Sequence, residues 1–139
     1  MTLRLHLQII GALLLILSAA HAFFPRYFRW KEELARLSTF TRQVFLVHCF
    51  FIALALALLG AASLVYPDAL LEPAALSRIL LPGIVLFWAC RLVVQFAVYD
   101  SSIWRGRGFY TAMHIVFSAF WIYVAAAYGL AMRRVWAGS

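Results

Sequence analysis

The chain has 139 residues, of which 66% are hydrophobic and only 12% are charged, and its mean hydropathy is +0.93. Soluble globular domains are about 45–50% apolar and about 25% charged, so these values exclude a soluble fold, and the high hydropathy excludes disordered and fibrous classes. The sequence is that of a small integral membrane protein, and its net charge of +7 has to lie mainly outside the membrane.

Four apolar runs are long enough to cross a bilayer as helices, because a hydrocarbon core of about 30 Å requires about 20 helical residues. The runs cover residues 5–24, 43–66, 79–99 and 109–132. Of the 12 Lys and Arg and the 5 Asp and Glu residues, only Arg91 lies inside a run. Transmembrane β-strands are half this length and alternate in polarity. We therefore predict an all-α integral membrane protein, an antiparallel four-helix bundle that forms a single domain over residues 1–139.

The first run resembles a secretory signal peptide, because Arg4 precedes the apolar residues 7–17 and the small tripeptide Ala20-His21-Ala22. Five basic residues follow this run directly, and a positive flank after an apolar run opposes translocation. We therefore expect the run to be kept as the first membrane span.

The segment between the first two spans, residues 25–42, mixes apolar side chains with charges. Its basic residues are Arg26, Arg29, Lys31, Arg36 and Arg42, and its apolar residues include Phe28, Trp30, Leu34 and Leu37. Glu32 and Arg36 have the i,i+4 spacing of a helical ion pair. The pattern predicts a short helix that lies at the membrane interface, with Trp30 at the depth of the headgroups.

Helix breakers stand close to the ends of the runs. They are Pro25, Pro67, Ser77, Gly106 and Gly108. Among them, Ser77 stands where it can cap the third helix. Pro82 lies inside the third run, where we expect a kink or an irregular start of the helix.

The basic residues outside the spans are distributed unevenly. The loops at 25–42 and 100–108 carry seven of them, whereas the two termini and the second connection carry four. Because cytoplasmic loops are enriched in Lys and Arg, this predicts that both loops are cytoplasmic and that both termini lie outside. Basic loops beside anionic headgroups also account for the net charge, so the expected partners are membrane lipids and not nucleic acid. A homo-oligomer or a place in a larger membrane complex fits the small size of the bundle.

Polar side chains inside the spans indicate function best, because polar groups in hydrocarbon carry a high free-energy cost. One end of each span holds such residues, and these four ends share one side of an up-down-up-down bundle. The residues are His21, His48, Arg91, Gln95 and His114. At 1.5 Å per residue they lie about 5–12 Å inside the span boundaries. We therefore predict a shared polar pocket near the cytoplasmic side.

Helical spacing adds aromatic residues to this pocket. Trp88 and Tyr99 fall on the same stripe of the third span as Arg91, and Trp121 falls on the same stripe of the fourth span as His114. The predicted binding residues therefore include these three aromatic side chains.

The small residues of the spans are predicted to serve packing. On the second span Ala53, Ala57 and Ala61 form a ridge that allows close approach of another helix. Cys49 and Cys90 each lie alone within a span, so we expect no disulfide and no cysteine metal site.

The favoured function is the binding of a redox cofactor or an amphiphilic ligand. Neutral imidazoles ligate haem iron and other metals, so His48, His114 and His21 are candidate metal ligands, and Arg91 would meet a haem propionate. A quinone fits as well, since His and Gln hydrogen-bond its carbonyl oxygens beside the tryptophans.

Two alternatives belong to other classes. One is a membrane enzyme that acts on a lipid-like substrate, with a histidine as general acid or base and Arg91 holding a phosphate or carboxylate. Its nearest catalytic candidates are Asp100, Ser101 and Ser102, although no nucleophile motif surrounds them. The other is a non-catalytic accessory or scaffold subunit, in which the polar groups set the register of the helices.

Overall fold

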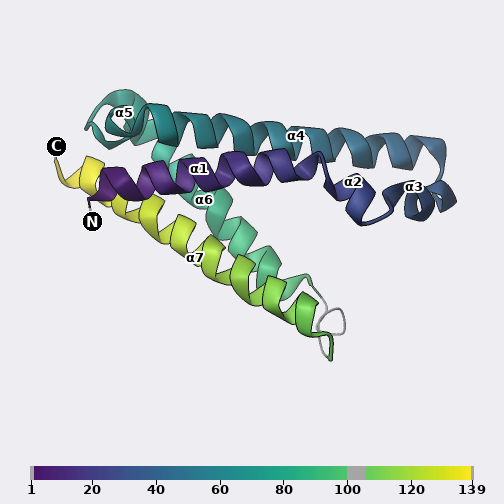
Figure 1. The fold of residues 1–139 in the computed structure, drawn as a ribbon. Helices are drawn as coiled ribbons and strands as arrows, with labels where there is room; N and C mark the ends of the chain where they lie inside the picture. Colours follow the sequence, from purple (N-terminus) through teal and green to yellow (C-terminus); the bar gives the residue numbers. More distant parts are fainter. Residues whose placement is uncertain (1, 100–105, 139) are drawn as a thin grey trace. The chain divides into compact units, whose positions relative to one another are not determined.

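The computed structural model describes residues 2–99 and 106–138, and within these ranges every regular element is a helix. The long helices are α1 (Leu3–His21), α4 (Thr39–Val65), α6 (Ala75–Ala97) and α7 (Gly108–Ala137), and the short ones are α2 (Phe24–Tyr27), α3 (Trp30–Glu33), the 3₁₀ helix η1 (Leu34–Arg36) and α5 (Pro67–Leu71) (Figure 1). Each long helix is long and apolar enough to cross a membrane. The all-α class and the four candidate spans predicted from the sequence are confirmed.

Three of the long helices, α4, α6 and α7, extend by several residues beyond the apolar runs that predicted them. α4 begins at Thr39 because Ser38 caps it, with its Oγ accepting a hydrogen bond of 3.2 Å from the Thr41 N–H. α7 continues to Ala137, past Arg133 and Arg134. Hydropathy marks the part of a helix suited to hydrocarbon, whereas capping and backbone hydrogen bonds decide where the helix ends.

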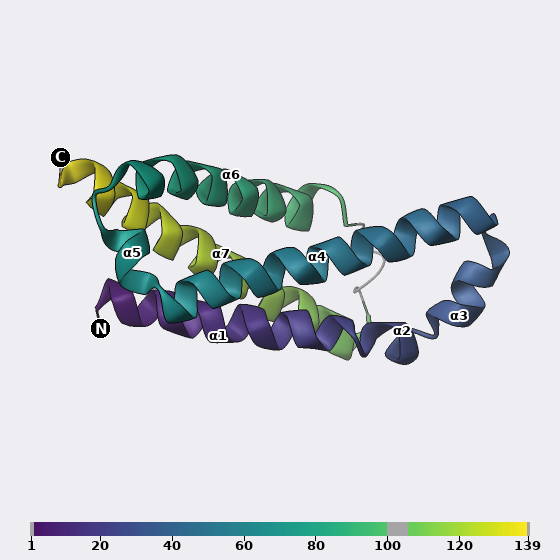
Figure 2. The ribbon, with the colours of Figure 1, turned by 90° about the horizontal axis from the view of Figure 1, so that it is seen from above.

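The contacts within the chain divide it into two compact units, which we describe separately. The α1–α4 unit comprises residues 7–67, and the α6–α7 unit comprises residues 2–6 with the described residues from 68 onward. Figure 2 shows the helices of each unit from a second direction.

In the α1–α4 unit, α1 and α4 run antiparallel and side by side (Figures 1 and 2). Their backbones are close at Gly11 and Gly60, where a Cβ atom added to Gly11 would lie 2.7 Å from the Gly60 carbonyl oxygen. The Ser18 hydroxyl donates a 2.7 Å hydrogen bond to the Ala53 carbonyl further along the same contact. Gly60 is therefore the small residue of this interface, whereas Ala61, the last member of the predicted ridge, is exposed.

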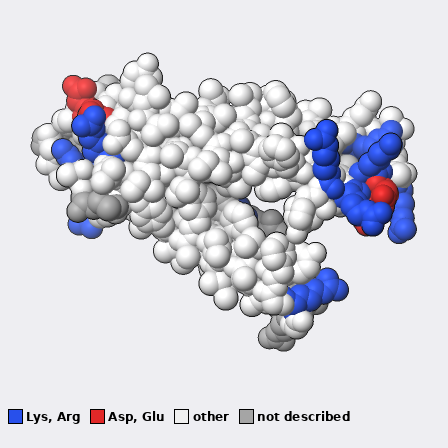
Figure 3. Space-filling view, in the orientation of Figure 1, with Lys and Arg blue, Asp and Glu red and all other residues white. Residues whose placement is uncertain are grey.

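The connection between α1 and α4 is not the single short helix that the pattern predicted. Arg29 adopts a left-handed conformation with φ 51°, and this residue separates α2 from α3. The guanidinium of Arg29 then pairs with Glu32 at 3.1 Å, in place of the predicted pair of Glu32 with Arg36. Trp30 packs edge-on against Phe45 of α4 with ring centroids 5.0 Å apart. Figure 3 shows Lys and Arg side chains gathered around this connection at one end of the unit.

In the α6–α7 unit, α6 and α7 run antiparallel in contact with each other (Figure 1). Apart from the adjacent Ala127 and Tyr128, the buried side chains of each helix recur at intervals of three, four or seven residues, as expected for a helix with one packed face. They are Ser77, Leu81, Trp88 and Gln95 on α6, and Trp121, Val124, Ala127, Tyr128, Ala131 and Val135 on α7. This packed face places Trp88 and Gln95 between the two helices.

The start of α6 differs from the prediction in two ways. The helix begins at Ala75 and continues through Pro82 as one element, so the expected irregular start at Pro82 is wrong, whereas the alternative of a kink there stays a prediction. Ser77 does not cap the helix, because its hydroxyl donates to the Glu72 and Ala74 carbonyls from within the first turn. A proline has no N–H, so the carbonyl four residues earlier in the helix loses its hydrogen-bond donor. Membrane helices tolerate such a proline when another group donates to this carbonyl.

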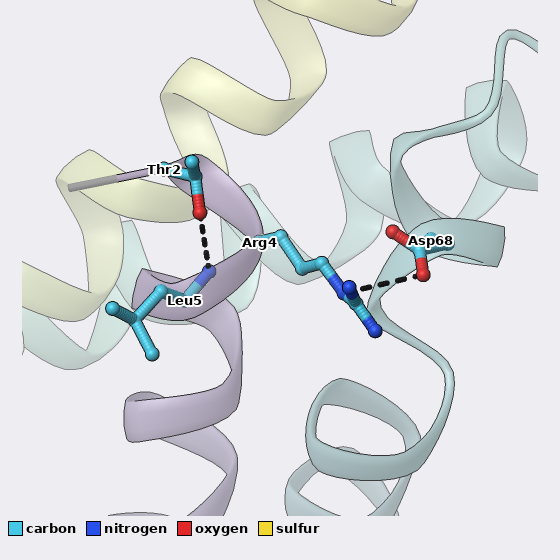
Figure 4. A network of polar contacts seen from close by, with 4 residues as sticks. All are labelled: Thr2, Arg4, Leu5 and Asp68. Carbon is cyan, nitrogen blue, oxygen red and sulfur yellow. Dashed lines mark hydrogen bonds and ion pairs between the residues drawn. The ribbon is translucent and has the colours of Figure 1, made fainter.

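Two polar contacts join the first turn of α1 to the rest of the α6–α7 unit. In the first, Arg4 Nε lies 3.2 Å from Asp68 Oδ2 at the start of α5 (Figure 4). Within the turn itself, the hydroxyl of Thr2 accepts a hydrogen bond of 3.4 Å from the Leu5 N–H. His6 lies next in the helix, and its Nδ1 is 2.8 Å from the Tyr123 hydroxyl of α7. These contacts tie residues 2–6 to α5 and α7.

Candidate functional site

Three of the predicted polar residues form a continuous chain of hydrogen bonds in the α6–α7 unit. Arg91 Nη1 donates to Gln95 Oε1 at 3.0 Å, and Gln95 Nε2 lies 2.9 Å from His114 Nδ1. Gln95 is buried, whereas Arg91 and His114 are half-buried. These hydrogen bonds therefore connect α6 to α7 within the apolar part of both helices.

The predicted tryptophans lie against this chain of hydrogen bonds. The rings of Trp88 and Trp121 are stacked, with centroids 5.1 Å apart and an angle of 19° between their planes. Arg91 Cζ lies 4.8 Å from the centroid of Trp121 and 5.8 Å from that of Tyr99, so the guanidinium makes cation–π contacts with both rings. We call these residues, with Gln95 and His114, the Trp–Arg cluster.

The spacing along each helix explains why these side chains meet. Residues 88 and 95 are two turns apart on α6, and residues 114 and 121 are two turns apart on α7. Because the helices are antiparallel, a register that brings Gln95 opposite His114 also brings Trp88 opposite Trp121. The structure therefore brings together the predicted residues of α6 and α7, and their role in binding stays a prediction.

Arg91 sets the direction of the hydrogen bonds in the cluster. A guanidinium can only donate, so the oxygen of Gln95 has to face Arg91 and its –NH₂ group has to face His114. Since –NH₂ also only donates, Nδ1 of His114 is the acceptor. In the neutral imidazole of His114 the proton then lies on Nε2.

Neither indole N–H group of the cluster has an acceptor among the described residues. Trp88 is 1% exposed and Trp121 is 4% exposed, and the Nε1 atom of each is buried with no hydrogen-bond partner among the residues that the structure describes. Buried donors in proteins are nearly always paired with protein, water or ligand, so two unpaired donors side by side need an explanation. The cluster therefore offers donors to an acceptor that the described chain does not supply.

His21 and His48 belong to the α1–α4 unit and have the opposite proton arrangement. His21 Nδ1 lies 2.8 Å from the Leu17 carbonyl oxygen, and His48 Nδ1 lies 2.7 Å from that of Val44. A carbonyl only accepts, so the neutral rings carry the proton on Nδ1 and leave Nε2 as an acceptor. Whether these two residues share a pocket with the Trp–Arg cluster stays a prediction.

Metal-ligating side chains do not gather in the described part of the chain. Within residues 2–99 and 106–138 there is no group of three or more His, Cys, Asp or Glu residues that could hold a metal ion. Cys49 and Cys90 are free thiols. The catalytic candidates Asp100, Ser101 and Ser102 lie outside the described residues.

One polar pair was not anticipated from the sequence. His6 lies at the opposite end of its span from His21, so the sequence does not place it with the other histidines, yet its Nδ1 lies 2.8 Å from the Tyr123 hydroxyl. The spacing of Tyr123 along the fourth span gives no sign of this contact, since His6 lies far away in the chain.

No protein family, characterised protein or solved structure gives a match to this chain. The function has to be argued from the site itself.

Proposed function

We propose that this protein is a multi-pass membrane protein that binds an amphiphilic ligand of the quinone type at the Trp–Arg cluster. The observation that carries the proposal is the pair of buried indole N–H groups, on Trp88 and Trp121, that have no acceptor among the described residues. The four apolar helices are compatible with a multi-pass membrane protein, and a quinone reaches a site within a membrane by diffusion in the lipid.

The polar atoms of the cluster favour a ligand with acceptor oxygens. The guanidinium of Arg91 and the two indole groups can only donate. A quinone has two carbonyl oxygens that only accept, a flat ring that stacks on an indole, and an apolar tail. These features complement the cluster.

The proton order of the cluster disfavours His114 as a haem ligand. Its Nδ1 accepts from Gln95 and its Nε2 carries the proton, so neither nitrogen has a lone pair directed at a metal. Iron ligation would require the Gln95 amide to turn its –NH₂ group toward Arg91, which places two donors against each other. The α6–α7 cluster therefore supports an oxygen acceptor better than iron.

A second candidate, haem or another metal, has a specific observation in its favour. His21 and His48 donate Nδ1–H to a carbonyl of their own helix, and this second-sphere hydrogen bond is the usual one for a metal-ligating histidine. Absorption spectra of the detergent-purified protein, oxidised and then reduced with dithionite, test this candidate directly. A Soret band with sharp reduced bands would favour haem over quinone.

We also propose that the four long helices form one antiparallel bundle with the connection at 25–42 on the cytoplasmic side. The excess of basic residues in this connection supports the orientation.

Binding of decylubiquinone to the detergent-purified protein tests the proposed function. We expect saturable binding in isothermal titration calorimetry. Trp88→Phe and Trp121→Phe keep an aromatic ring but remove the N–H, and each is expected to weaken binding by about threefold to tenfold, the usual effect of one lost hydrogen bond. Gln95→Leu should weaken binding further, because it also releases Arg91 and His114 from their present positions.

Trp30→Phe is the matched control, because Trp30 packs against Phe45 in the α1–α4 unit and takes no part in the cluster. Its affinity should equal that of the wild type. Thermal unfolding of each variant shows whether the fold is retained. If all three tryptophan variants bind the quinone equally well, the indole N–H groups do not bind it and the proposal is wrong. Binding that does not saturate would also contradict the proposal, because it would show that no specific site exists.

A further inference from the structure

An open groove of about 330 Å³ lies in the α6–α7 unit, far along α7 from the Trp–Arg cluster. It is lined by Pro82 of α6 and by Met132, Arg133 and Trp136 of α7. Met132 follows Trp121 by eleven residues, which corresponds to about 16 Å along the helix. The groove is therefore a separate feature from the cluster.

The groove stands where α7 leaves the hydrocarbon. With 30 residues, α7 is about 45 Å long, longer than the apolar core of a bilayer of about 30 Å. Arg133 and Arg134 follow directly after its last apolar stretch, so they mark the level of the headgroups. Trp136 is 57% exposed, and an exposed tryptophan next to basic residues is typical of the membrane interface.

The positive charge around the groove is not neutralised within the described chain. The ion pairs among the described residues are Arg4–Asp68 and Arg29–Glu32, so Arg133, Arg134 and Arg78 have no carboxylate partner there. Arg78 lies one helical turn before Pro82, and its Nε is buried with no hydrogen-bond partner in the described part of the molecule. An apolar groove lined by Arg133, with Arg78 and Arg134 near it along the helices and no carboxylate partner for the three among the described residues, matches a ligand with a phosphate and a hydrocarbon chain.

We propose that this groove binds an anionic phospholipid. The phosphate lies against Arg133, with Arg78 and Arg134 adding positive charge, and an acyl chain runs over Pro82 and Met132. The ring of Trp136 packs at the level of the glycerol. The proposal rests on the placement of the chain in a membrane, which it shares with the proposed function, but not on the quinone site.

Native mass spectrometry with lipid mixtures tests this proposal. The full chain is released from micelles that contain equal amounts of phosphatidylglycerol and phosphatidylcholine, and the retained lipid is measured. We expect one phosphatidylglycerol to be retained in preference to phosphatidylcholine. Arg133→Gln should lower this retention about fivefold, the usual contribution of one basic residue beside an anionic lipid. Arg133→Gln combined with Arg78→Gln should abolish the preference.

Arg36→Gln is the matched control, because Arg36 is an exposed arginine of η1 at a distance along the chain from the groove residues. It should retain phosphatidylglycerol as the wild type does. Equal retention by Arg133→Gln and Arg36→Gln would overturn the proposal, as would equal retention of the two lipids. The same spectra report the oligomeric state. If Arg133→Gln splits an oligomer and no lipid is retained in the wild type, a second copy occupies the groove instead.

Two further measurements separate this site from the proposed function. Trp88→Phe should leave phosphatidylglycerol retention unchanged, and Arg133→Gln should leave the affinity for decylubiquinone unchanged. If only the quinone titration fails, the proposed function is wrong and the lipid proposal is unaffected. If only the lipid retention fails, the lipid proposal is wrong and the quinone proposal is unaffected. Absence of the chain from the membrane fraction of the cell would contradict both proposals.

Discussion

The direction of the hydrogen bonds at the Trp–Arg cluster follows from a single residue. Arg91 has no acceptor atoms, so the Gln95 amide can take only one of its two orientations, and this orientation decides which nitrogen of His114 carries the proton. His21 and His48 have carbonyl oxygens as partners and therefore carry the proton on the other nitrogen. The histidines of this protein thus differ in whether Nδ1 accepts or donates a hydrogen bond.

This difference gives a prediction for the imidazole nitrogens. In protein labelled with ¹⁵N-histidine, at a pH where the rings are neutral, His114 should show the Nε2–H tautomer, and His21 and His48 should show Nδ1–H. Gln95→Glu should convert His114 to Nδ1–H, because a carboxylate accepts from both Arg91 and His114. Nitrogen chemical shifts in NMR spectra of the detergent-solubilised protein distinguish the two tautomers.

His6 serves as the internal control for this experiment. Its partner is the Tyr123 hydroxyl, which both donates and accepts, so Gln95→Glu has no reason to change its signal. Spectra in which His114 already has Nδ1–H in the wild type would contradict the proton order and remove the argument against haem ligation by this residue.

At the scale of helices, α1 and α4 depend on two glycines. A Cβ atom added to Gly11 would lie 2.6 Å from the Leu64 backbone nitrogen and 2.7 Å from the Gly60 carbonyl oxygen. Both obstacles are backbone atoms, which no change of rotamer can move. A Cβ atom at Gly60 would in turn meet the Gly11 carbonyl oxygen at 2.9 Å. The two helices can be this close only because both positions lack a side chain.

Gly11→Ala and Gly60→Ala should therefore destabilise the protein. We expect each to lower the free energy of unfolding by about 1–3 kcal/mol, as overpacking does in other cores, measured by denaturant or thermal unfolding in detergent. Gly83→Ala and Gly129→Ala are matched controls, because both lie inside helices and a Cβ atom at either meets nothing within 4 Å. They should be neutral or stabilising by up to about 1 kcal/mol. Equal losses at all four positions would show that helix separation is not the cause.

Sequence patterns predicted the long helices well and their local details less well. The separation of charged from apolar residues follows directly from the cost of charge in hydrocarbon, so four candidate spans could be read from it. The pair of Glu32 with Arg36 was wrong because the i,i+4 rule assumes an α-helix, whereas residues Leu34–Arg36 form the 3₁₀ helix η1 and Glu32 pairs with Arg29 instead. The break between α2 and α3 was missed because Arg29 has a positive φ, a conformation that an arginine side chain does not signal.

At the scale of the whole molecule, the proximity of the α6 and α7 side chains could be predicted from the sequence for a physical reason. α6 and α7 are joined by a short connection, so they pack as antiparallel neighbours, and stripes on such neighbours meet at matching levels. Trp88, Gln95, His114 and Trp121 therefore came together as expected. The levels of His21 and His48 were counted along separate helices, and depth alone does not specify which side chains face each other.

The orientation of the chain in the membrane is a property of the whole molecule that charge alone predicts. The connections at 25–42 and 100–108 carry more basic residues than the termini and the connection at 67–78, so these two connections should face the cytoplasm. Four crossings then place both termini on the opposite side. Single cysteines at positions 35 and 138 report the two sides, because Ala35 and Gly138 are exposed and lie outside the four long helices.

Labelling of intact cells with a membrane-impermeant maleimide measures this orientation. In a background of Cys49→Ala and Cys90→Ala, Gly138→Cys should react in intact cells, whereas Ala35→Cys should react only after the membrane is made permeable. Arg26→Gln combined with Arg36→Gln should weaken the bias, because these changes remove two of the five charges that hold the first connection inside. A mixed population labelled at both positions is the expected sign of this weakening. If Ala35→Cys reacts in intact cells while all five basic residues of the first connection are kept, the orientation is the opposite of the predicted one. The groove of Arg133 and Trp136 would then lie in the cytoplasmic leaflet.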